Sequence, residues 1–192
     1  IQYIPNGINC NSQISRFDHA DKEKYILFSA GRIYHLKGLH ILLAAVNKIN
    51  LKRQILIIGD LDQAPAYRDE CKNSAKNLNV KFGGLIKNKE QLMKIIKNAD
   101  LFIFPSFAEA MSMMLLEVAS MRTPIIASNI PSNLSVFKHD EILFFESGNI
   151  DDLSKKIEYA LENKEIMINK ASKAFTKLSN NYTWDRIAKQ YK

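Results

Sequence analysis

Short apolar runs alternate with segments of helical spacing along most of the 192-residue chain. Each run is bounded by turn-forming residues and is too short to be a helix, so we predict that each run is a strand. The predicted strands are Tyr25–Ala30, Gln54–Ile58, Val80–Phe82, Leu101–Phe104, Pro124–Ala127 and Ile142–Phe145.

The segments between these runs carry apolar residues three and four positions apart, at residues 39–49, 92–99 and 115–120. That spacing is typical of one face of a helix. Strands that alternate with helices form right-handed βαβ units in one sheet. We therefore predict an α/β fold: a Rossmann-like parallel sheet of about six strands with helices on both faces. After Gly148 the pattern changes to helices only.

The length and the 46% hydrophobic content fit a single domain over residues 1–192. The chain begins without methionine, in an apolar segment that contains Ile1, Tyr3 and Ile4 and runs into Pro5-Asn6-Gly7. Such a segment is typical of a strand end or of a crossing between domains. We expect the chain to be a piece of a longer protein.

The net charge of +7 is compatible with a nucleic acid, an anionic membrane surface or a phosphorylated small molecule as partner. Lysines and arginines are interspersed with acids and form no arginine-rich stretch, so we expect no nucleic-acid partner. The longest apolar runs are far shorter than the roughly 20 residues that cross a bilayer. We expect a cytoplasmic protein, with peripheral contact at the inner face of the membrane as an open alternative.

Neither the cysteines nor the histidines show the spacing of a metal site. Cys10 and Cys71 are far apart and have no CxxC partner, which favours reduced thiols. The four histidines show no ligand spacing, and we assign a catalytic or metal role to none of them.

Two cations and a flexible turn follow the first predicted strand. Gly31-Arg32 comes directly after the strand, and Lys37-Gly38 opens the next helix. Ligands bind at the carboxyl edge of a parallel sheet, where a helix N-terminus, an arginine fork and a lysine can hold phosphate. Neither a P-loop nor a GxGxxG fingerprint is present. The spacing alone is equally compatible with two surface cations.

Two glutamates lie near the end of another predicted strand. Glu109 falls in the loop after Leu101–Phe104, and Glu117 falls within the second turn of the following helix. They are predicted to meet different parts of one ligand. The alternative is a loop acid near a helix dipole together with an exposed helix acid.

These residues together resemble the carboxy-terminal domain of retaining glycosyltransferases with the GT-B fold, the family called glycosyltransferase family four or group one. The likeness spans nearly the whole chain. Its marks, in order, are Pro5-Asn6-Gly7-Ile8-Asn9, Gly31-Arg32 with Lys37-Gly38, Ile57-Ile58-Gly59-Asp60, Phe82-Gly83-Gly84, Ala99-Asp100 before Pro105-Ser106, and the spaced pair Glu109 and Glu117. Each motif is weak alone, whereas six in the right order are strong.

The resemblance implies a hexosyltransferase-like enzyme that transfers sugar from a nucleotide-diphosphate sugar with retention of configuration. It implies that Arg32 and Lys37 hold the diphosphate, that Glu109 faces the sugar and that Glu117 holds ribose hydroxyls. Gly31, the loop residues Ala110 and Ser112, the backbone amides of Met111–Met113, and a base pocket lined by Leu85 and Ile86 complete the expected donor site. No metal or other cofactor is expected, since fixed cations can stabilise the departing diphosphate.

The resemblance also implies partners outside this chain. An amino-terminal domain of the same protein would supply the site for a glycan or lipid-linked acceptor, as in polysaccharide biosynthesis. This chain alone is therefore expected to bind donor and to be inactive.

The chain departs from the family at three places. Glu109-Ala110-Met111-Ser112 stands where Glu-Gly-aromatic-Gly is common, Arg122 stands where glycine is usual, and Asn133 stands where glutamate is common. Side chains replace glycines that close ligand approach or positive φ can require. Arg122 is either an extra phosphate or partner contact or a surface arginine. Two other functions stay open: a non-catalytic sugar-nucleotide binding or scaffolding module, and a GT-B epimerase or phosphorylase.

Overall fold

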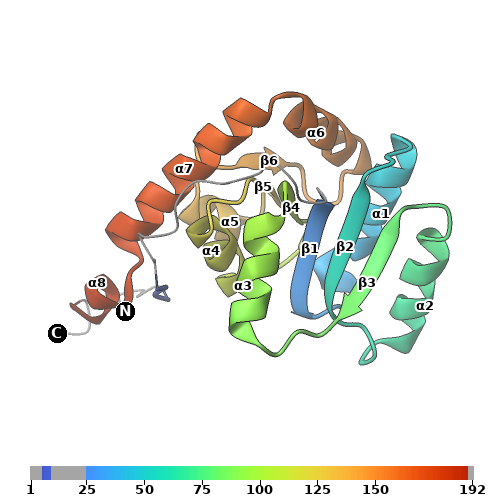
Figure 1. The fold of residues 1–192 in the computed structure, drawn as a ribbon, viewed down its shortest axis with the longest axis horizontal. Coiled ribbons are helices and arrows are strands. Elements are labelled where there is room, and N and C mark those ends of the chain that lie inside the picture. Colours follow the sequence, from blue (N-terminus) through green and yellow to red (C-terminus); the bar gives the residue numbers. More distant parts are fainter. Residues whose placement is uncertain (1–5, 10–24, 190–192) are drawn as a thin grey trace.

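The computed structural model describes residues 6–9 and 25–189, and its centre is a parallel sheet (Figure 1). The strands are β1 Tyr25–Arg32, β2 Gln54–Asp60, β3 Val80–Gly84, β4 Leu101–Phe104, β5 Ile125–Ser128 and β6 Leu143–Phe145. Their order in the sheet is β3-β2-β1-β4-β5-β6, and every neighbouring pair is parallel. The predicted six-stranded Rossmann-like sheet is confirmed. The segment Ile1–Pro5 and Cys10 lie outside the described residues.

Helices connect the strands and then close the described part of the chain. They are η1 His35–Lys37 (a 3-10 helix), α1 Leu39–Lys48, α2 Pro65–Ser74, α3 Lys89–Asn98, α4 Met113–Ser120, α5 Pro131–Val136, α6 Ile150–Glu162, α7 Lys164–Asn181 and α8 Trp184–Ala188. Asparagine or serine side chains cap three of them: Asn88, Ser112 and Asn149 each accept a hydrogen bond from a backbone amide in the first turn.

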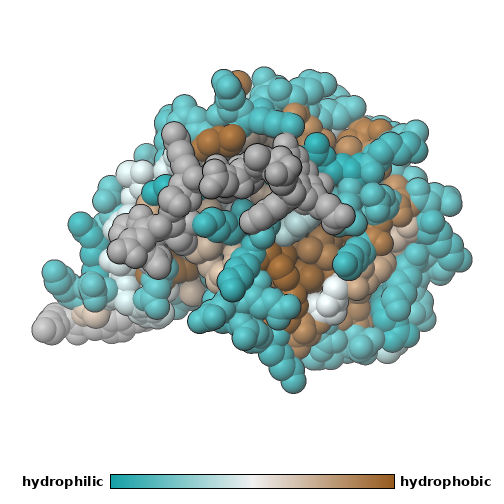
Figure 2. All heavy atoms as spheres, in the orientation of Figure 1, coloured by the Kyte–Doolittle hydropathy of each residue, from teal (hydrophilic) through white to brown (hydrophobic). Residues whose placement is uncertain are grey.

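Apolar residues on the two faces of the sheet make two cores. In β1, Ile26 and Phe28 pack into the core that contains α1, α2 and α6, while Leu27 packs into the core of α3, α4 and α7. Successive side chains of a strand point to opposite faces, so helices cover both. Figure 2 shows hydrophobic residues gathered beside α3, over the half of the sheet that contains β1–β3.

Two α-helices, α2 and α5, have no counterpart in the predicted pattern. In α2 only Tyr67 and Cys71 are buried, and these two positions are too few to produce a helical stripe in the sequence. The second, α5, has six residues and buries only Asn133 and Val136. Because Asn133 is polar, the helix shows no apolar stripe in the sequence. Both helices begin with a proline in the first turn, which is a start signal that the sequence does contain.

Gly38 sets how closely the loop after β1 approaches the loop after β4. Its φ is +71°, and a Cβ atom at this position would lie 2.1 Å from the backbone oxygen of Pro105. A second contact joins the same loops, because the amide of Phe107 donates to the carbonyl of Leu36 at 2.9 Å. Only glycine fits this close approach without displacing backbone.

Candidate active site at the reversal of strand order

The strand order reverses at β1, which has β2 on one side and β4 on the other. In an open parallel sheet, the connections on the two sides of such a reversal run in opposite directions and leave a crevice at the carboxyl edge. The loops that flank this crevice follow β1 and β4. They contain Lys37 and Glu109, which lie 72 residues apart in sequence.

Lys37 and Glu109 form an ion pair across this crevice. The Nζ atom of Lys37 lies 2.6 Å from Oε1 of Glu109, and the two side chains are only 18% and 12% exposed. η1 fixes the backbone of Lys37, whose amide donates to the carbonyl of Tyr34 at 2.8 Å. This ion pair is therefore a sheltered link between the two loops that approach each other at Gly38.

Arg32 ends β1 on the same edge of the sheet. It is exposed and lies in register with Asp60 of β2. The carboxylate of Asp60 accepts hydrogen bonds from the amide of Asp62 and from Nε2 of Gln63. Within residues 6–9 and 25–189, no acid forms an ion pair with Arg32, so its guanidinium is available to an anion. Gly31 beside it is exposed, with open space where a side chain would be.

Glu117 is placed in the second turn of α4, as predicted, and its side chain is 14% exposed. Its Oε1 atom forms an ion pair with Nζ of Lys89, the first residue of α3. Each of the two glutamates is thus paired with a different lysine, Glu109 with Lys37 of η1 and Glu117 with Lys89 of α3. The alternative that Glu117 is an exposed helix acid is therefore wrong.

In the loop after Glu109, the residues that replace the family's glycines cause no backbone strain. None of the residues 110–112 has a positive φ, so the family's glycines are not needed here for backbone conformation. Ala110 is exposed, and Ser112 caps α4 by accepting from the amide of Leu115 at 3.3 Å. Met111 accepts a hydrogen bond on its Sδ atom from the amide of Asn6. Met113 is the first residue of α4.

A pocket of about 270 Å³ lies at the carboxyl ends of β2 and β3. Leu85, which is 49% exposed, lines it together with Phe82, Gly84 and Asp60. Ile86 instead packs against the core on the α3 side of the sheet. Of the two residues expected to contact a base, the structure brings Leu85 but not Ile86 to this pocket.

An aromatic cluster next to Lys37 was not predicted from the sequence. The rings of His35 and His40 lie 4.2 Å apart, and both face Phe107 of the loop after β4. Nδ1 of His40 lies 2.8 Å from the hydroxyl of Tyr67, which also accepts from the His40 amide. The histidines flank Lys37 in sequence, but only the fold shows that Tyr67 and Phe107 complete the cluster. Because His35 belongs to η1, the cluster packs against the turn that holds Lys37.

Burial lowers the pKa of His40, and the neighbouring His35 lowers it further, while Glu70 opposes them. The unfolded chain therefore takes up this proton first as the pH falls below about 6.5. We expect the free energy of unfolding to decrease as the pH drops through that range. Urea unfolding gives the free energy of unfolding at about pH 8 and at about pH 5.5, and the difference between these two values should be smaller in His40→Gln than in the wild type. An unchanged difference would show that His40 does not titrate on unfolding.

Two departures from the family have structural explanations. Arg122 has φ +56°, the conformation that explains a glycine there, and its guanidinium packs 4.0 Å from the ring centroid of Phe175. It precedes β5 at the amino edge, so the expected alternative of an extra donor-phosphate contact is wrong. Asn133 is buried and donates to the carbonyl of Ser128 at 2.9 Å, which ties α5 to the end of β5.

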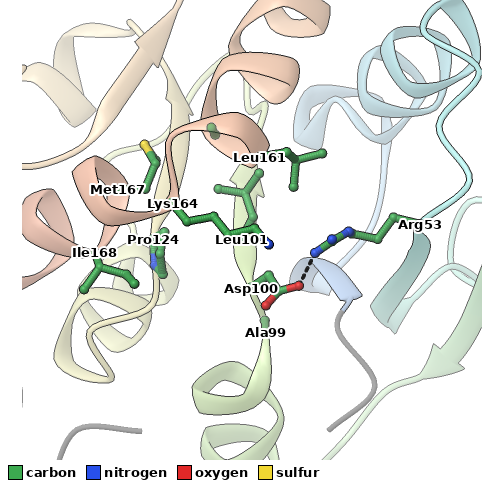
Figure 3. A pocket seen from close by; sticks show the side chains of 10 residues that line it. Arg53, Ala99, Asp100, Leu101, Pro124, Leu161, Lys164, Met167 and Ile168 are labelled. Carbon is green, nitrogen blue, oxygen red and sulfur yellow. Dashed lines mark hydrogen bonds and ion pairs between the residues drawn. The ribbon is translucent and has the colours of Figure 1, made fainter. Parts of the chain in front are cut away.

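A second pocket, of about 190 Å³, lies at the opposite, amino edge of the sheet (Figure 3). Leu101, Met167 and Lys164 line it beside the ion pair of Arg53 and Asp100. No residue of the expected donor site lines this pocket, so it is separate from that site. Over the described ranges, no three His, Cys, Asp or Glu residues are grouped to hold a metal ion. None of the helices in that part is both long and apolar enough to span a bilayer.

The sheet order and the charged crevice define a doubly wound α/β domain. The family described as Glycosyl transferases group 1 matches residues 11–178, and the chain belongs to this family. It is 30% identical over 177 residues to an uncharacterized glycosyltransferase of Methanocaldococcus jannaschii, covering 88% of this chain and 44% of the relative.

Two further proteins extend the comparison. The chain is 24% identical over 155 residues to the N,N'-diacetylbacillosaminyl-diphospho-undecaprenol alpha-1,3-N-acetylgalactosaminyltransferase of Campylobacter jejuni, covering 80% of this chain and 40% of that protein. Anabaena HepE, solved in complex with UDP-glucose, shares the fold with a TM-score of 0.78 at 21% identity, covering 87% of this chain and 47% of its own. The chain spans less than half of each of these three proteins.

Proposed function

We propose that this chain is the donor-binding, carboxy-terminal domain of a retaining glycosyltransferase. The observation that supports this most is the sheltered pair of Lys37 and Glu109 at the reversal of strand order, on the same edge of the sheet as Arg32, which has no ion-pair partner in the part of the chain that the structure describes. Family membership and a solved neighbour that binds UDP-glucose support a nucleotide-sugar as the ligand.

In the proposed complex, Arg32 and Lys37 bind the diphosphate and Glu109 faces the sugar. Breaking the anomeric bond leaves negative charge on the departing diphosphate, and fixed cations stabilise that charge without a metal. The donor competes with Glu109 for Lys37, so the ion pair seen here would loosen as phosphate oxygens arrive. Glu117 holds the ribose, Leu85 and Ile86 contact the base, and amides of Met111–Met113 reach phosphate or sugar oxygens.

The rest of the enzyme lies outside this chain. An amino-terminal domain supplies the acceptor site, so the chain alone binds donor without transferring sugar. The acceptor is a glycan or a lipid-linked glycan, in line with the undecaprenol-linked substrate named for the Campylobacter relative. We place the protein in the cytoplasm, where nucleotide-sugars are made, with peripheral contact at the inner face of the membrane.

Nucleotide binding in the intact protein tests the donor site. We expect at least one of the uridine, guanosine and adenosine diphosphates to bind, and Arg32→Ala combined with Lys37→Ala to weaken that binding by about 100-fold or more. Lys48→Ala is the matched control, because Lys48 pairs with Asp151 at a distance of 2.5 Å in an exposed position. Titration calorimetry measures both. Equal affinities in the double variant and the wild type would contradict the proposal.

The turnover of the intact protein separates catalysis from binding alone. An enzyme should transfer sugar with the anomeric configuration kept, which product analysis shows directly. A protein that binds donor but neither transfers nor hydrolyses sugar, with donor affinity unaffected by Glu109→Ala, would instead be a non-catalytic binding module.

A further inference from the structure

Lys89 is a cation at a position where a helix disfavours one. It is the first residue of α3, and the N-terminus of a helix carries a partial positive charge. The cap itself needs nothing from Lys89, because Asn88 accepts the hydrogen bond from the amide of Gln91 at 2.9 Å. The lysine side chain is directed to an acid on another helix, Glu117 of α4.

The ion pair of Lys89 and Glu117 is asymmetric. Lys89 is 57% exposed, whereas Glu117 is 14% exposed, so the carboxylate is far more sheltered than the lysine that pairs with it. Lys89 pairs with Oε1 of Glu117, and among the described residues no hydrogen bond or ion pair to Oε2 is found. One carboxylate oxygen is held, and the second can accept a hydrogen bond from a ligand.

The same short loop connects this pair to the pocket at the ends of β2 and β3. Leu85 lines that pocket. In the proposed donor complex the base contacts Leu85 and Glu117 holds the ribose, and Lys89, which pairs with Glu117, follows Leu85 by four residues.

We propose that Lys89 is a positioning residue for ribose recognition: it holds the Glu117 carboxylate in the orientation in which Oε2 accepts a ribose hydroxyl. This inference rests on the proposed donor site. Lys89 does not itself touch the diphosphate. Its removal should reduce the preference for ribose over deoxyribose and leave the diphosphate contribution intact.

The test compares UDP with 2′-deoxy-UDP and 3′-deoxy-UDP in the intact protein by titration calorimetry, with the guanosine and adenosine series in parallel. We expect the wild type to bind the ribose form about tenfold more tightly than one of the deoxy forms, because that hydroxyl bonds to a charged acceptor. In Lys89→Met this ratio should fall to about threefold or less, and Lys89→Arg should restore it. Lys87→Met is the matched control, since Lys87 lies in the same loop.

Each other outcome decides against the inference. A ratio in Lys89→Met equal to that of the wild type, or equal weakening of ribose and deoxy forms, would show a merely structural role. Tighter binding of UDP to Lys89→Met would show that the lysine blocks the site. A wild type that binds UDP through Arg32 and Lys37 without any ribose preference would overturn this inference alone. No binding of any nucleoside diphosphate would overturn the donor site as well.

Discussion

In the intact protein, Lys37→Met is expected to lower the rate of sugar transfer by about 100-fold or more. In the proposed donor complex, the substitution removes a fixed cation from the departing diphosphate, and one such preorganised donor typically contributes about 3 kcal/mol. It also leaves Glu109, which is 12% exposed, without its partner beside the sugar. The measurement is kcat at saturating donor, so that weaker binding does not obscure the loss in the chemical step.

Lys48→Met is the control for the loss of a lysine. Lys48 pairs with Asp151, and both side chains are more than half exposed, so the kcat of this variant should match that of the wild type. A kcat for Lys37→Met within about threefold of the wild type would mean that the Lys37–Glu109 pair is structural and that another group stabilises the leaving diphosphate.

Gly38→Ala is expected to lower the free energy of unfolding by about 3 kcal/mol or more. The new methyl group meets the backbone oxygen of Pro105, and a non-glycine residue is strained at φ +71°. Unfolding by urea measures the loss. Two other glycines separate these causes: Gly84 has φ +67° with open space around its Cβ position, and Gly31 has open space without a positive φ.

The expected order of destabilisation is Gly38→Ala, then Gly84→Ala, then Gly31→Ala. Strain alone at Gly84 should cost about 1 kcal/mol, and Gly31→Ala should be near neutral. Equal effects at Gly38 and Gly84 would show that the loop after β4 yields to the methyl group, and that the close approach of the two loops is not required for stability.

Burial explains which strands could be predicted from the sequence. All four residues of β4 are buried, so its predicted bounds are those observed. By contrast, β1 continues two residues past its predicted end, through Gly31 and Arg32, because Arg32 still pairs with Asp60. Those residues are exposed and give no apolar signal. Backbone pairing therefore extends strands where side-chain hydropathy has already ended.

The candidate site was predicted residue by residue, but its contacts were not. The sequence spacing predicts a role for Lys37 and for Glu109 separately. Only the resemblance to a family predicts that both lie in one site. Their direct pairing depends on the sheet order, which brings the ends of β1 and β4 together. Lys89 cannot be singled out from the sequence, because it is one of many lysines and its pairing with Glu117 depends on how α3 packs beside α4.

The parallel arrangement also dictates when the crevice can form during synthesis. β1 gains its first neighbour when β2 emerges, but its other side stays unpaired until β4 is made, about seventy residues after β1. Pairing between distant segments is slow because a long stretch of chain must first be ordered. A nascent chain that ends before residue 101 would therefore expose one edge of its central strand, a state prone to aggregation.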